Sequence, residues 1–292
     1  MVAANDVLGA NVRATVLSRN PARFRAEVPH LGLRPEFAWV VGEPAGFEVP
    51  AGGFDYLIDV ATPSAAEVGA GGTAIVERCL QGSANLLGFA KSASVRRVLY
   101  ASSGAVYGRQ PENVERLAED FPADAATVSP YGRLKQRSEV LLLGSGLDCV
   151  IARGFAFIGP YLPLTDKFAA GSFIHDALAG GPIRINGDGT PLRSYLYAAD
   201  LAIWLLTLLV RGRAGEAYNV GSDHAISLVK LATDIAMLAG GAAIEIAKPP
   251  SASHPGRYVP AIRKARDGLG IDAPLALATG LQRTLAWARQ TA

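Results

Sequence analysis

Short, continuously apolar runs alternate with longer helical stretches over the first half of this sequence. A strand that helices cover on both faces has such an unbroken run, whereas a strand with one solvated face alternates apolar and polar residues. Five runs meet this description, and they span residues 12–17, 37–41, 55–60, 97–101 and 149–152. Strands that alternate with helices at this spacing predict an α/β fold with a doubly wound parallel sheet.

Helices are expected between these strands. Residues 73–91 carry their apolar side chains on roughly one stripe, as an amphipathic helix does. Pro130–Leu143 has clearer limits, because Ser129 can cap its start, a proline stands at its first position and Gly144 follows its end. The second half of the chain is less regular and predicts a smaller, mixed lobe. Its expected helices span residues 168–179, 201–209, 228–238 and 279–289, and its Gly/Pro-rich segments span 180–191 and 249–260.

Composition excludes several other classes of protein. Half of the 292 residues are hydrophobic and 18% are charged, so the chain can bury a sizeable core. The net charge of +2, without a basic run, argues against nucleic acid or an anionic membrane as the main partner. The longest apolar run, residues 201–210, is too short to span a bilayer, and the first residues show no secretory signal. We therefore expect a cytoplasmic protein.

Metal-binding and disulfide patterns are not expected either. Cys79 and Cys149 make neither a disulfide framework nor a metal-ligand cluster, as is typical of a reducing compartment. The four histidines, at positions 30, 175, 224 and 254, lack ligand spacing, so we assign no metal.

Tyr131 and Lys135 are the first candidate catalytic pair. Residues four apart lie on one face of a helix, so the phenol and the ammonium can point into one site. A lysine beside a phenol favours the phenolate and lowers the phenol's pKa from ~10 toward the range of a general base. The spacing is also common by chance, and an exposed tyrosine beside a solvated lysine is the alternative.

Two serines strengthen the first interpretation. Ser102 and Ser103 directly follow the strand predicted at residues 97–101. Open α/β sheets bind ligands beyond the carboxyl ends of their strands, which is where these hydroxyls would lie. A turn stabilised by a serine side chain would explain one of the two serines, but not the whole sequence from Ser102 to Gly108. A hydroxyl after one strand, followed by Tyr and Lys on the next helix, indicates a hydride-transfer site.

The chain resembles a known family at several ordered motifs. These are ASSGAVYG (101–108), SPYGRLK (129–135), RGFAFIGP (153–160), GDG (187–189) followed by Arg193, YLYAADL (195–201), YNVG (218–221) and KARDGLG (264–270). Together they resemble the extended short-chain dehydrogenase/reductases, and within these the NAD-dependent epimerase/dehydratase group that acts on nucleotide sugars. The resemblance implies a Rossmann-like NAD(P)-binding domain of residues 1–160 and 192–222. It also implies a substrate-binding lobe of residues 161–191 and 223–292.

The resemblance implies a role for each matching residue. Tyr131 would be the catalytic acid/base, Lys135 would hold the nicotinamide ribose and lower the phenol's pKa, and Ser103 would hydrogen-bond the reacting sugar oxygen. Arg193 would pair with the diphosphate of the substrate, a task that suits a forked guanidinium. The remaining residues expected at the site are Ala61 and Ser102 near the cofactor and Tyr195 near the substrate.

One expected part of the family pattern is not found. The family opens with a strand and a glycine-rich turn that receives the cofactor's pyrophosphate, whereas this sequence begins where the first helix is expected. Residues 69–74 match G-x-G-x-x-A, but no strand ends directly before them, so we expect a loop that caps the next helix. The intact downstream motifs favour a start placed too late, or a truncated chain, over an impaired protein.

Departures from the family pattern narrow the expected cofactor and reaction. Ser18 and Arg19 follow the first strand, where an NAD-preferring protein would place an acidic residue; arginine suits a 2′-phosphate, so NADP is favoured over NAD. A solvated turn that begins at Arg19 is the alternative. Gly104 and Ala105 replace the Asp-Glu pair of the 4,6-dehydratases, and the acid of the sugar-acid decarboxylases is missing at the same place.

These substitutions disfavour a dehydratase and leave a nucleotide-sugar 4-epimerase or 4-ketosugar reductase. Ala156 replaces a substrate-contacting asparagine, which leaves the sugar open. A non-catalytic or impaired family member, and an oxidoreductase acting on a small non-sugar carbonyl, are the alternatives. Residues 73–91 and Pro130–Leu143 match the helices that pair in family dimers, so we expect a homodimer.

Overall fold

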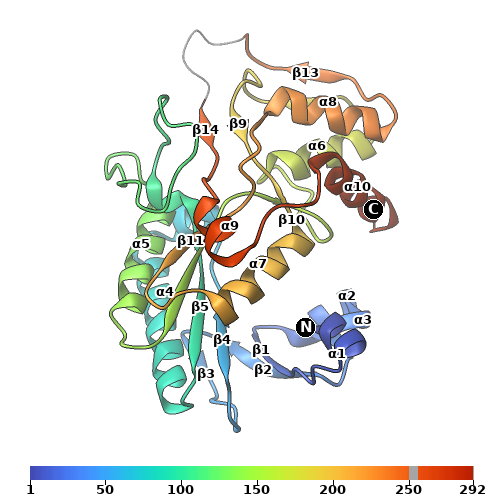
Figure 1. Cartoon of the computed structure of the whole chain (residues 1–292). Helices are drawn as coiled ribbons and strands as arrows, with labels where there is room; N and C mark the ends of the chain where they lie inside the picture. The colour runs from blue at the N-terminus through green and yellow to red at the C-terminus, as the bar shows by residue number, and fades with distance from the viewer. Residues whose placement is uncertain (250–255, 292) are drawn as a thin grey trace.

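A four-stranded parallel sheet forms the centre of the molecule. The computed structural model describes residues 1–249 and 256–291, and its central strands follow the order β11-β6-β5-β4 (Figure 1). These strands are β4 (Tyr56–Asp59), β5 (Arg97–Ser103), β6 (Cys149–Gly154) and β11 (Ala217–Val220). The parallel doubly wound class expected from the unbroken apolar runs is therefore confirmed.

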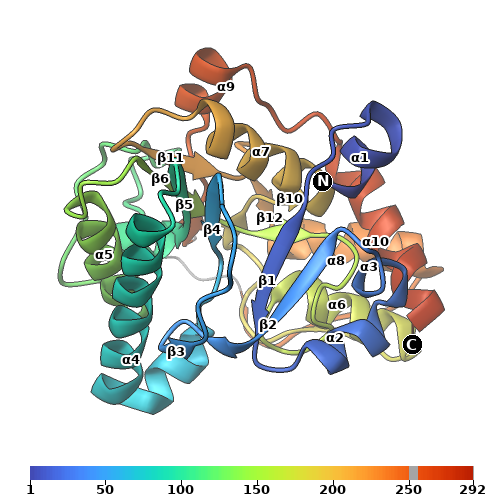
Figure 2. The same ribbon diagram turned by 90° about the horizontal axis from the view of Figure 1, so that it is seen from below.

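The first strands form a sheet of their own. β1 (Ala14–Ser18) pairs in parallel with β2 (Phe37–Glu43), and β3 (Gly46–Phe47) adds an antiparallel strand to β2. Within residues 1–249 and 256–291, no strand hydrogen-bonds β1 to β4, so the sheet is divided in two (Figure 2). Tyr56 and Ile58, alternate residues of β4, are 39% and 40% exposed, so the face of β4 that carries them is partly uncovered.

Helices cover both faces of the central sheet. α4 (Ala65–Ser92) packs beside α5 (Pro130–Leu143), and α5 lies against β5, while α7 (Ala198–Arg211) covers β5 and β6 from the other side. Leu87, Val98 and Leu142 are buried on the α5 side, and Leu99 and Trp204 on the α7 side. The sheet therefore has apolar contacts on both faces, which explains its strands without polar alternation.

Helix α5 has the predicted limits, but α4 corrects a prediction. The stretch 69–74, expected as a loop, lies within α4, which begins at Ala65 and is kinked at Gly72 (φ 55°, ψ −143°). A capping box starts this helix: Ser64 Oγ accepts from the Glu67 N–H (3.2 Å), and Glu67 Oε2 accepts from the Ser64 N–H (2.7 Å). Residues 69–74 therefore do not form the strand, glycine turn and helix that bind a dinucleotide.

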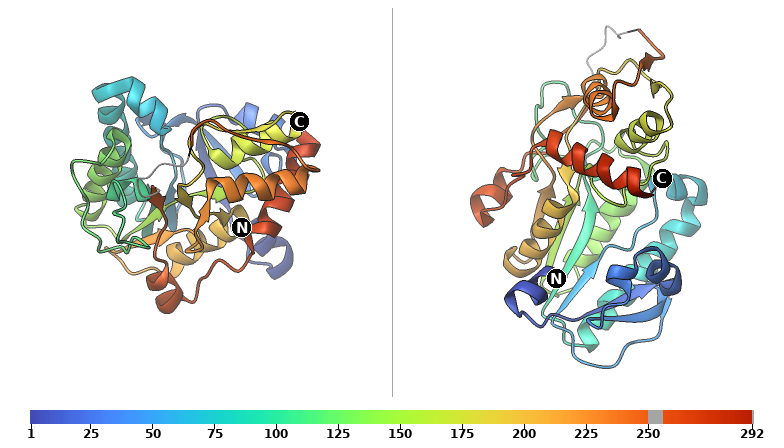
Figure 3. Two further views of the ribbon diagram at one scale, coloured as in Figure 1. Left: turned by 90° about the horizontal axis from the view of Figure 1, so that it is seen from above. Right: turned by 90° about the vertical axis from the view of Figure 1, so that its right-hand side faces the viewer.

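The smaller lobe packs around its own apolar cluster, which contains Ile174, Leu231 and Leu285. Its helices lie beyond the end of the central sheet (Figure 3). They are α6 (Ala169–Leu178), α8 (Leu228–Ala239) and α10 (Leu277–Thr291), each at a predicted position. The short strands outside the central sheet, after β6, are β7 (Phe157–Ile158), β8 (Ile183–Ile185), β9 (Leu192–Arg193), β10 (Leu196–Tyr197), β12 (Ile226–Ser227), β13 (Ile244–Ile246) and β14 (Arg257–Tyr258).

The remaining elements are short. They are α1 (Val2–Leu8), α2 (Pro21–Glu27), α3 (Pro29–Gly32), the 3-10 helix η1 (Gly104–Tyr107) and α9 (Arg263–Leu269). α9 packs against β11, so Ala265 and Leu269 join the core beneath the central sheet. In the described part of the chain, none of the helices is long and apolar enough to cross a membrane. Six residues of the predicted Gly/Pro-rich segment 249–260, His254 among them, lie outside the described residues.

Candidate active site

The two serines at the end of β5 point in different directions. Successive residues of a strand face opposite sides of the sheet, so the Ser102 and Ser103 side chains lie on opposite faces. Ser102 is buried and donates a hydrogen bond to Glu139 Oε1 (2.5 Å) beneath the site. Ser103 caps η1, and its Oγ accepts the Ala105 N–H (3.2 Å). Ser103 is therefore the serine that faces the candidate active site, while Ser102 ties β5 to α5.

Tyr131 and Lys135 come from the first two turns of α5 and lie beside Ser103. The Lys135 Nζ is 5.8 Å from the centroid of the Tyr131 ring. Burial raises the pKa of the Tyr131 phenol, and hydrogen bonding with the Ser103 side chain opposes this shift. The predicted lowering of the phenol's pKa by Lys135 is therefore not found. The physical reason is that the ammonium bonds to other groups.

Lys135 turns its ammonium into the protein. The residue is 1% exposed, and Nζ donates to Thr62 Oγ1 and to the Ala101 carbonyl, both at 2.6 Å. Nζ also lies 4.6 Å from the centroid of the Tyr100 ring, a favourable cation–π contact. Burial lowers the pKa of the ammonium to about 8, opposed by the negative charge of Asp59.

Asp59 is a site residue that was not predicted. It ends β4, is 5% exposed, and accepts the Ala61 N–H at Oδ1 (3.1 Å). Burial raises the pKa of this carboxyl to about 6, opposed by the Ala61 hydrogen bond and by Lys135. Asp59 and Thr62 could have been suspected from polar residues at the end of an apolar strand. The hydrogen bond of Thr62 with Lys135, and the effect of the Asp59 charge on Lys135, could not.

A buried polar network connects α5, the helix that carries Tyr131 and Lys135, to the central sheet. Arg153 on β6 pairs with Glu139 on α5 through two contacts (2.7 and 3.1 Å). Its remaining nitrogen donates to the Tyr107 hydroxyl (2.9 Å), which in turn donates to Asn219 Oδ1 on β11 (2.7 Å). The network joins β6, α5, η1 and β11. It therefore fixes α5, and with it Tyr131 and Lys135, relative to the sheet.

The expected substrate residues lie on β9 and just after it. Arg193 pairs in register with Tyr258 of β14 and donates to its own neighbour, the Leu192 carbonyl (2.9 Å). Burial raises the pKa of Tyr195 to about 12, and the charge of Arg193 opposes this shift. Burial also raises the pKa of Tyr258, and the Ser103 side chain and the charge of Arg193 oppose this shift. The charge of Arg193 thus acts on residues of the site. Tyr258 is a further residue near the site that was not predicted from the sequence.

The expected cofactor residues lie at the ends of two unconnected strands. Ser18 ends β1 and accepts the Asn20 N–H (3.2 Å), and Arg19 is exposed with its charge acting on Glu67. Ala61 follows β4. The Ser103 hydroxyl and the Tyr131 phenol fit the nicotinamide end of a dinucleotide, and the Lys135 ammonium has one hydrogen left to donate after its bonds to Thr62 and Ala101. Between β1 and β4, the described residues offer no strand and glycine turn for the dinucleotide's pyrophosphate.

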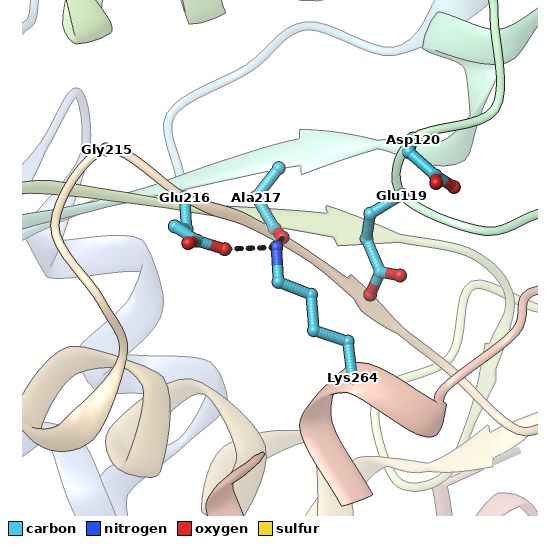
Figure 4. Close-up of a pocket in the computed structure, with 6 residues that line it drawn as sticks. All are labelled: Glu119, Asp120, Gly215, Glu216, Ala217 and Lys264. Carbon is cyan, nitrogen blue, oxygen red and sulfur yellow. Dashed lines mark hydrogen bonds and ion pairs between the residues drawn. The ribbon is translucent and has the colours of Figure 1, made fainter. Parts of the chain in front are cut away.

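A pocket of about 540 Å³ lies at the β11 edge, and none of the predicted site residues lines it (Figure 4). Its lining residues are Glu119, Asp120, Gly215, Glu216, Ala217 and Lys264. Lys264 Nζ pairs with Glu216 (2.5 Å) and donates to the Ala217 carbonyl (2.7 Å). These contacts connect α9 to the start of β11, which is a structural role.

Sequence relatives indicate the family. The NAD dependent epimerase/dehydratase family matches residues 11–221. A dTDP-glucose 4,6-dehydratase from Streptomyces niveus is 29% identical over 203 residues, which cover 65% of this chain and 56% of that protein. The chain spans between 21% and 56% of the length of the first curated relatives that it matches.

Solved structures share the fold. A UDP-glucose 4-epimerase from Thermotoga maritima, solved with UDP-glucose, has a TM-score of 0.83 and 21% identity, covering 99% of this chain and 95% of that one. A dTDP-glucose 4,6-dehydratase from Streptomyces venezuelae, solved with NAD and TYD bound, has a TM-score of 0.83 and 25% identity, covering 99% and 91%. The resemblance of the motifs to the extended short-chain dehydrogenase/reductases is confirmed, and the chain belongs to the NAD dependent epimerase/dehydratase family.

Proposed function

We propose that the protein is a nucleotide-sugar 4-epimerase or 4-ketosugar reductase. The observation that carries this proposal is the meeting of Ser103, Tyr131 and Lys135 at the carboxyl end of β5. A hydroxyl, a phenol and an ammonium are the groups needed to move a proton at a carbinol oxygen while hydride moves at its carbon. Family membership supports a nucleotide sugar as the substrate.

In the proposed mechanism, Tyr131 exchanges the proton of the sugar C4 hydroxyl. Its phenolate accepts that proton during oxidation, and its neutral phenol returns one during reduction. Ser103 hydrogen-bonds the reacting oxygen and so orients it toward the phenol. A nicotinamide dinucleotide supplies or accepts the hydride when bound, and Tyr131 and Lys135 would hold its ribose. Arg193 would pair with the substrate diphosphate.

Elimination of water is disfavoured because the protein lacks room for an acid after Ser103. A Cβ added at Gly104 would lie 2.7 Å from Phe155 Cζ and 2.7 Å from the Tyr258 hydroxyl oxygen. Ala105 carries no titratable group. The dehydratase alternative would need a carboxyl at this place, and side chains from β14 and from the loop after β6 already fill it.

The cofactor preference, the two lobes and the dimer remain proposals. Arg19, exposed after β1, favours a 2′-phosphate and hence NADP. The apolar cluster around Ile174 and Leu231 supports a substrate-binding lobe, but Ala265 and Leu269, which were expected in that lobe, pack in the cluster beneath the central sheet. Val140 and Leu143, which are 72% and 44% exposed on α5, support a homodimer through α4 and α5. A monomer mass by light scattering at micromolar protein would contradict the dimer.

Incubation with a 4-keto nucleotide sugar and NADPH separates the two reactions. Stoichiometric loss of the reduced-nicotinamide absorbance indicates a reductase. With a 4-hydroxy nucleotide sugar and NAD(P) in place of the 4-keto sugar, interconversion of the 4-epimers without net change in absorbance indicates an epimerase. Tyr131→Phe must abolish either activity. If the unaltered protein shows neither activity and no saturable NAD(P) binding by calorimetry, the non-catalytic alternative holds.

A further inference from the structure

Thr62 lies in a short connection between β4 and α4 whose two ends are fixed. Asp59 ends β4, and its carboxylate accepts the Ala61 N–H (3.1 Å), so the chain turns directly after the strand. Ser64 then starts α4 as the first member of its capping box. Pro63 favours an extended backbone at Thr62, and a β-branched side chain such as that of Thr62 has few rotamers. The direction of the Thr62 hydroxyl is therefore set by its neighbours in the chain.

This hydroxyl meets the ammonium of Lys135. Thr62 Oγ1 accepts one N–H of Lys135 Nζ, and the Ala101 carbonyl oxygen of β5 accepts another, both at 2.6 Å. Such short distances are typical of hydrogen bonds from a charged donor. Two oxygens from different parts of the sheet edge, one after β4 and one in β5, thus hold one ammonium from α5.

One of the three Lys135 N–H groups is left without a protein oxygen. Residues 1–249 and 256–291 provide two oxygen acceptors for Nζ, whereas an ammonium has three hydrogens. The Tyr100 ring, with its centroid 4.6 Å from Nζ, attracts the charge but is a weaker acceptor than an oxygen. Because Lys135 is 1% exposed, bulk water does not replace the missing acceptor. A buried donor without an acceptor is unfavourable, so the third N–H is available to a ligand oxygen.

A ligand can come close to this ammonium. Thr62 bonds directly to Nζ, and the Tyr131 ring centroid lies 5.8 Å from it. Both residues are partly exposed. A ligand that contacts Thr62 and Tyr131 therefore has an oxygen within reach of Lys135.

Thr62 determines the direction of the third N–H. With Ala101 as its one acceptor, the lysine could turn about that single hydrogen bond. A second acceptor fixes the tetrahedral nitrogen, and with it the remaining hydrogen. The surrounding charges do not have this effect, because a charge attracts the ammonium without selecting one of its hydrogens.

The titratable groups that act on the ammonium come from three elements. They are Asp59 of β4, Cys79 of α4 and Glu139 of α5, and each favours the charged form of Lys135. They oppose burial, which favours the neutral amine. These groups therefore affect how much of the ammonium is present, whereas Thr62 affects where it points.

We propose that Thr62 is a positioning residue that holds Lys135 so that its third N–H is directed toward a hydroxyl oxygen of a bound ligand. The inference rests on the proposed function, in which this oxygen belongs to the nicotinamide ribose. Thr62 acts through Lys135 and takes no part in proton or hydride transfer.

Thr62→Val and Thr62→Ser test this proposal as a pair. Valine keeps the branched shape of threonine but removes the acceptor, whereas serine keeps the hydroxyl. By calorimetry, the Kd of the full chain for NADH or NADPH should rise about 3–10-fold in Thr62→Val, the effect of one lost hydrogen bond. Thr62→Ser should bind within about 2-fold of the unaltered protein, because its hydroxyl can still accept from Lys135.

Titration of Lys135 gives a second readout that needs no ligand. In protein labelled with ¹³C at lysine Cε, the Lys135 resonance is identified by its loss in Lys135→Met. The Lys135 midpoint should fall by roughly 0.5–1 pH unit in Thr62→Val, because loss of an acceptor disfavours the ammonium. In Thr62→Ser it should stay within about 0.3 pH unit of the unaltered protein.

Thr207→Val is the matched control. Its hydroxyl donates to the Ile203 carbonyl within α7 (2.8 Å), and α7 covers the opposite face of the sheet from α5. This variant should change neither the Kd nor the Lys135 midpoint. Thermal melting verifies that each variant is folded, and Thr62→Ala, which also removes the acceptor, replaces Thr62→Val if valine is not tolerated.

The two readouts separate failure of this proposal from failure of the proposed function. An unchanged Lys135 midpoint in Thr62→Val, or an equal fall in Thr62→Ser or in the control, overturns the role of Thr62. An unchanged Kd in Thr62→Val, when the unaltered protein binds the dinucleotide, overturns it as well. If the unaltered protein binds neither dinucleotide, the proposed function fails, and the midpoint alone decides whether Thr62 holds Lys135.

Discussion

Asp59 and Lys135 occupy one buried region at the carboxyl edge of the sheet, and each opposes the effect of burial on the other. Burial raises the pKa of the Asp59 carboxyl to about 6, and the nearby ammonium lowers it. Burial lowers the pKa of the Lys135 ammonium to about 8, and the nearby carboxylate raises it. The charge of Lys135 on α5, which is proposed to hold the nicotinamide ribose, thus depends on the carboxylate of Asp59 on β4.

Asp59→Asn should make Lys135 easier to deprotonate. Without the carboxylate, the Lys135 pKa should fall below about 8, so the ammonium is lost at lower pH. In the proposed enzyme, the alkaline limb of the kcat/KM profile should move to lower pH. Asp55→Asn is the control, because that carboxylate is 72% exposed at its side chain. An alkaline limb at the same pH in Asp59→Asn and in the unaltered protein would show that Asp59 does not act on Lys135.

The same carboxyl should make stability depend on pH. Its folded pKa of about 6 exceeds the ordinary 3.8, so the folded chain binds this proton more tightly than the unfolded chain. The stability gained in this way is present below about pH 4 and is lost as pH rises through about 6. The destabilisation by Asp59→Asn should therefore shrink by up to about 3 kcal/mol between pH 4 and pH 7. Urea unfolding at both pH values measures it, and a pH-independent difference would contradict it.

Tyr131→Phe should remove activity while keeping the fold. Loss of a general acid/base typically lowers the rate by about 10²–10⁴-fold. The phenol is only half-buried, so the variant should unfold within about 1 kcal/mol of the unaltered protein. Single-turnover rates and urea unfolding give both quantities. Retention of more than a tenth of the rate would remove Tyr131 from the proposed role.

Glu139→Ala should be strongly destabilising, because it leaves the Arg153 guanidinium without its carboxylate partner. Both side chains are largely buried, with 17% and 7% exposure for Arg153 and Glu139. Removal of one member of a buried ion pair costs about 3–5 kcal/mol. The control is Glu77→Ala, whose pair with Arg137 is exposed and worth less than about 1 kcal/mol. Equal unfolding free energies for the two variants would contradict this account of the network beneath the site.

Gly104→Ala should disturb the site because its new methyl group meets Phe155 and Tyr258 at 2.7 Å. Overpacking of this kind costs about 1–3 kcal/mol. Adding Phe155→Leu should restore part of the stability by making room. Gly88→Ala in α4 is the control, since a Cβ there meets nothing within 4 Å and alanine favours a helix. If Gly104→Ala is as stable as this control, the space beside Ser103 is not filled as described.

The sequence alone determined the features that local residues encode. Pro130–Leu143 was predicted with its observed limits because the Ser129 cap, the first-turn proline and Gly144 lie within or next to the helix itself. The spacing of Tyr131 and Lys135 placed both on one helical face for the same reason. The start of α4 was missed because the signal there is the short capping box of Ser64 and Glu67, which precedes the apolar stripe used for the prediction.

Only the tertiary structure decided what these groups do to one another. Thr62, which accepts from Lys135, is 73 residues away in the chain, and Tyr258 lies still farther from Ser103. Burial depends on the packing of several elements, and it raised the Tyr131 pKa where the spacing alone predicted a decrease. Periodicity and caps act within a few residues, whereas desolvation and hydrogen-bond partners arise from segments that meet only in the folded chain.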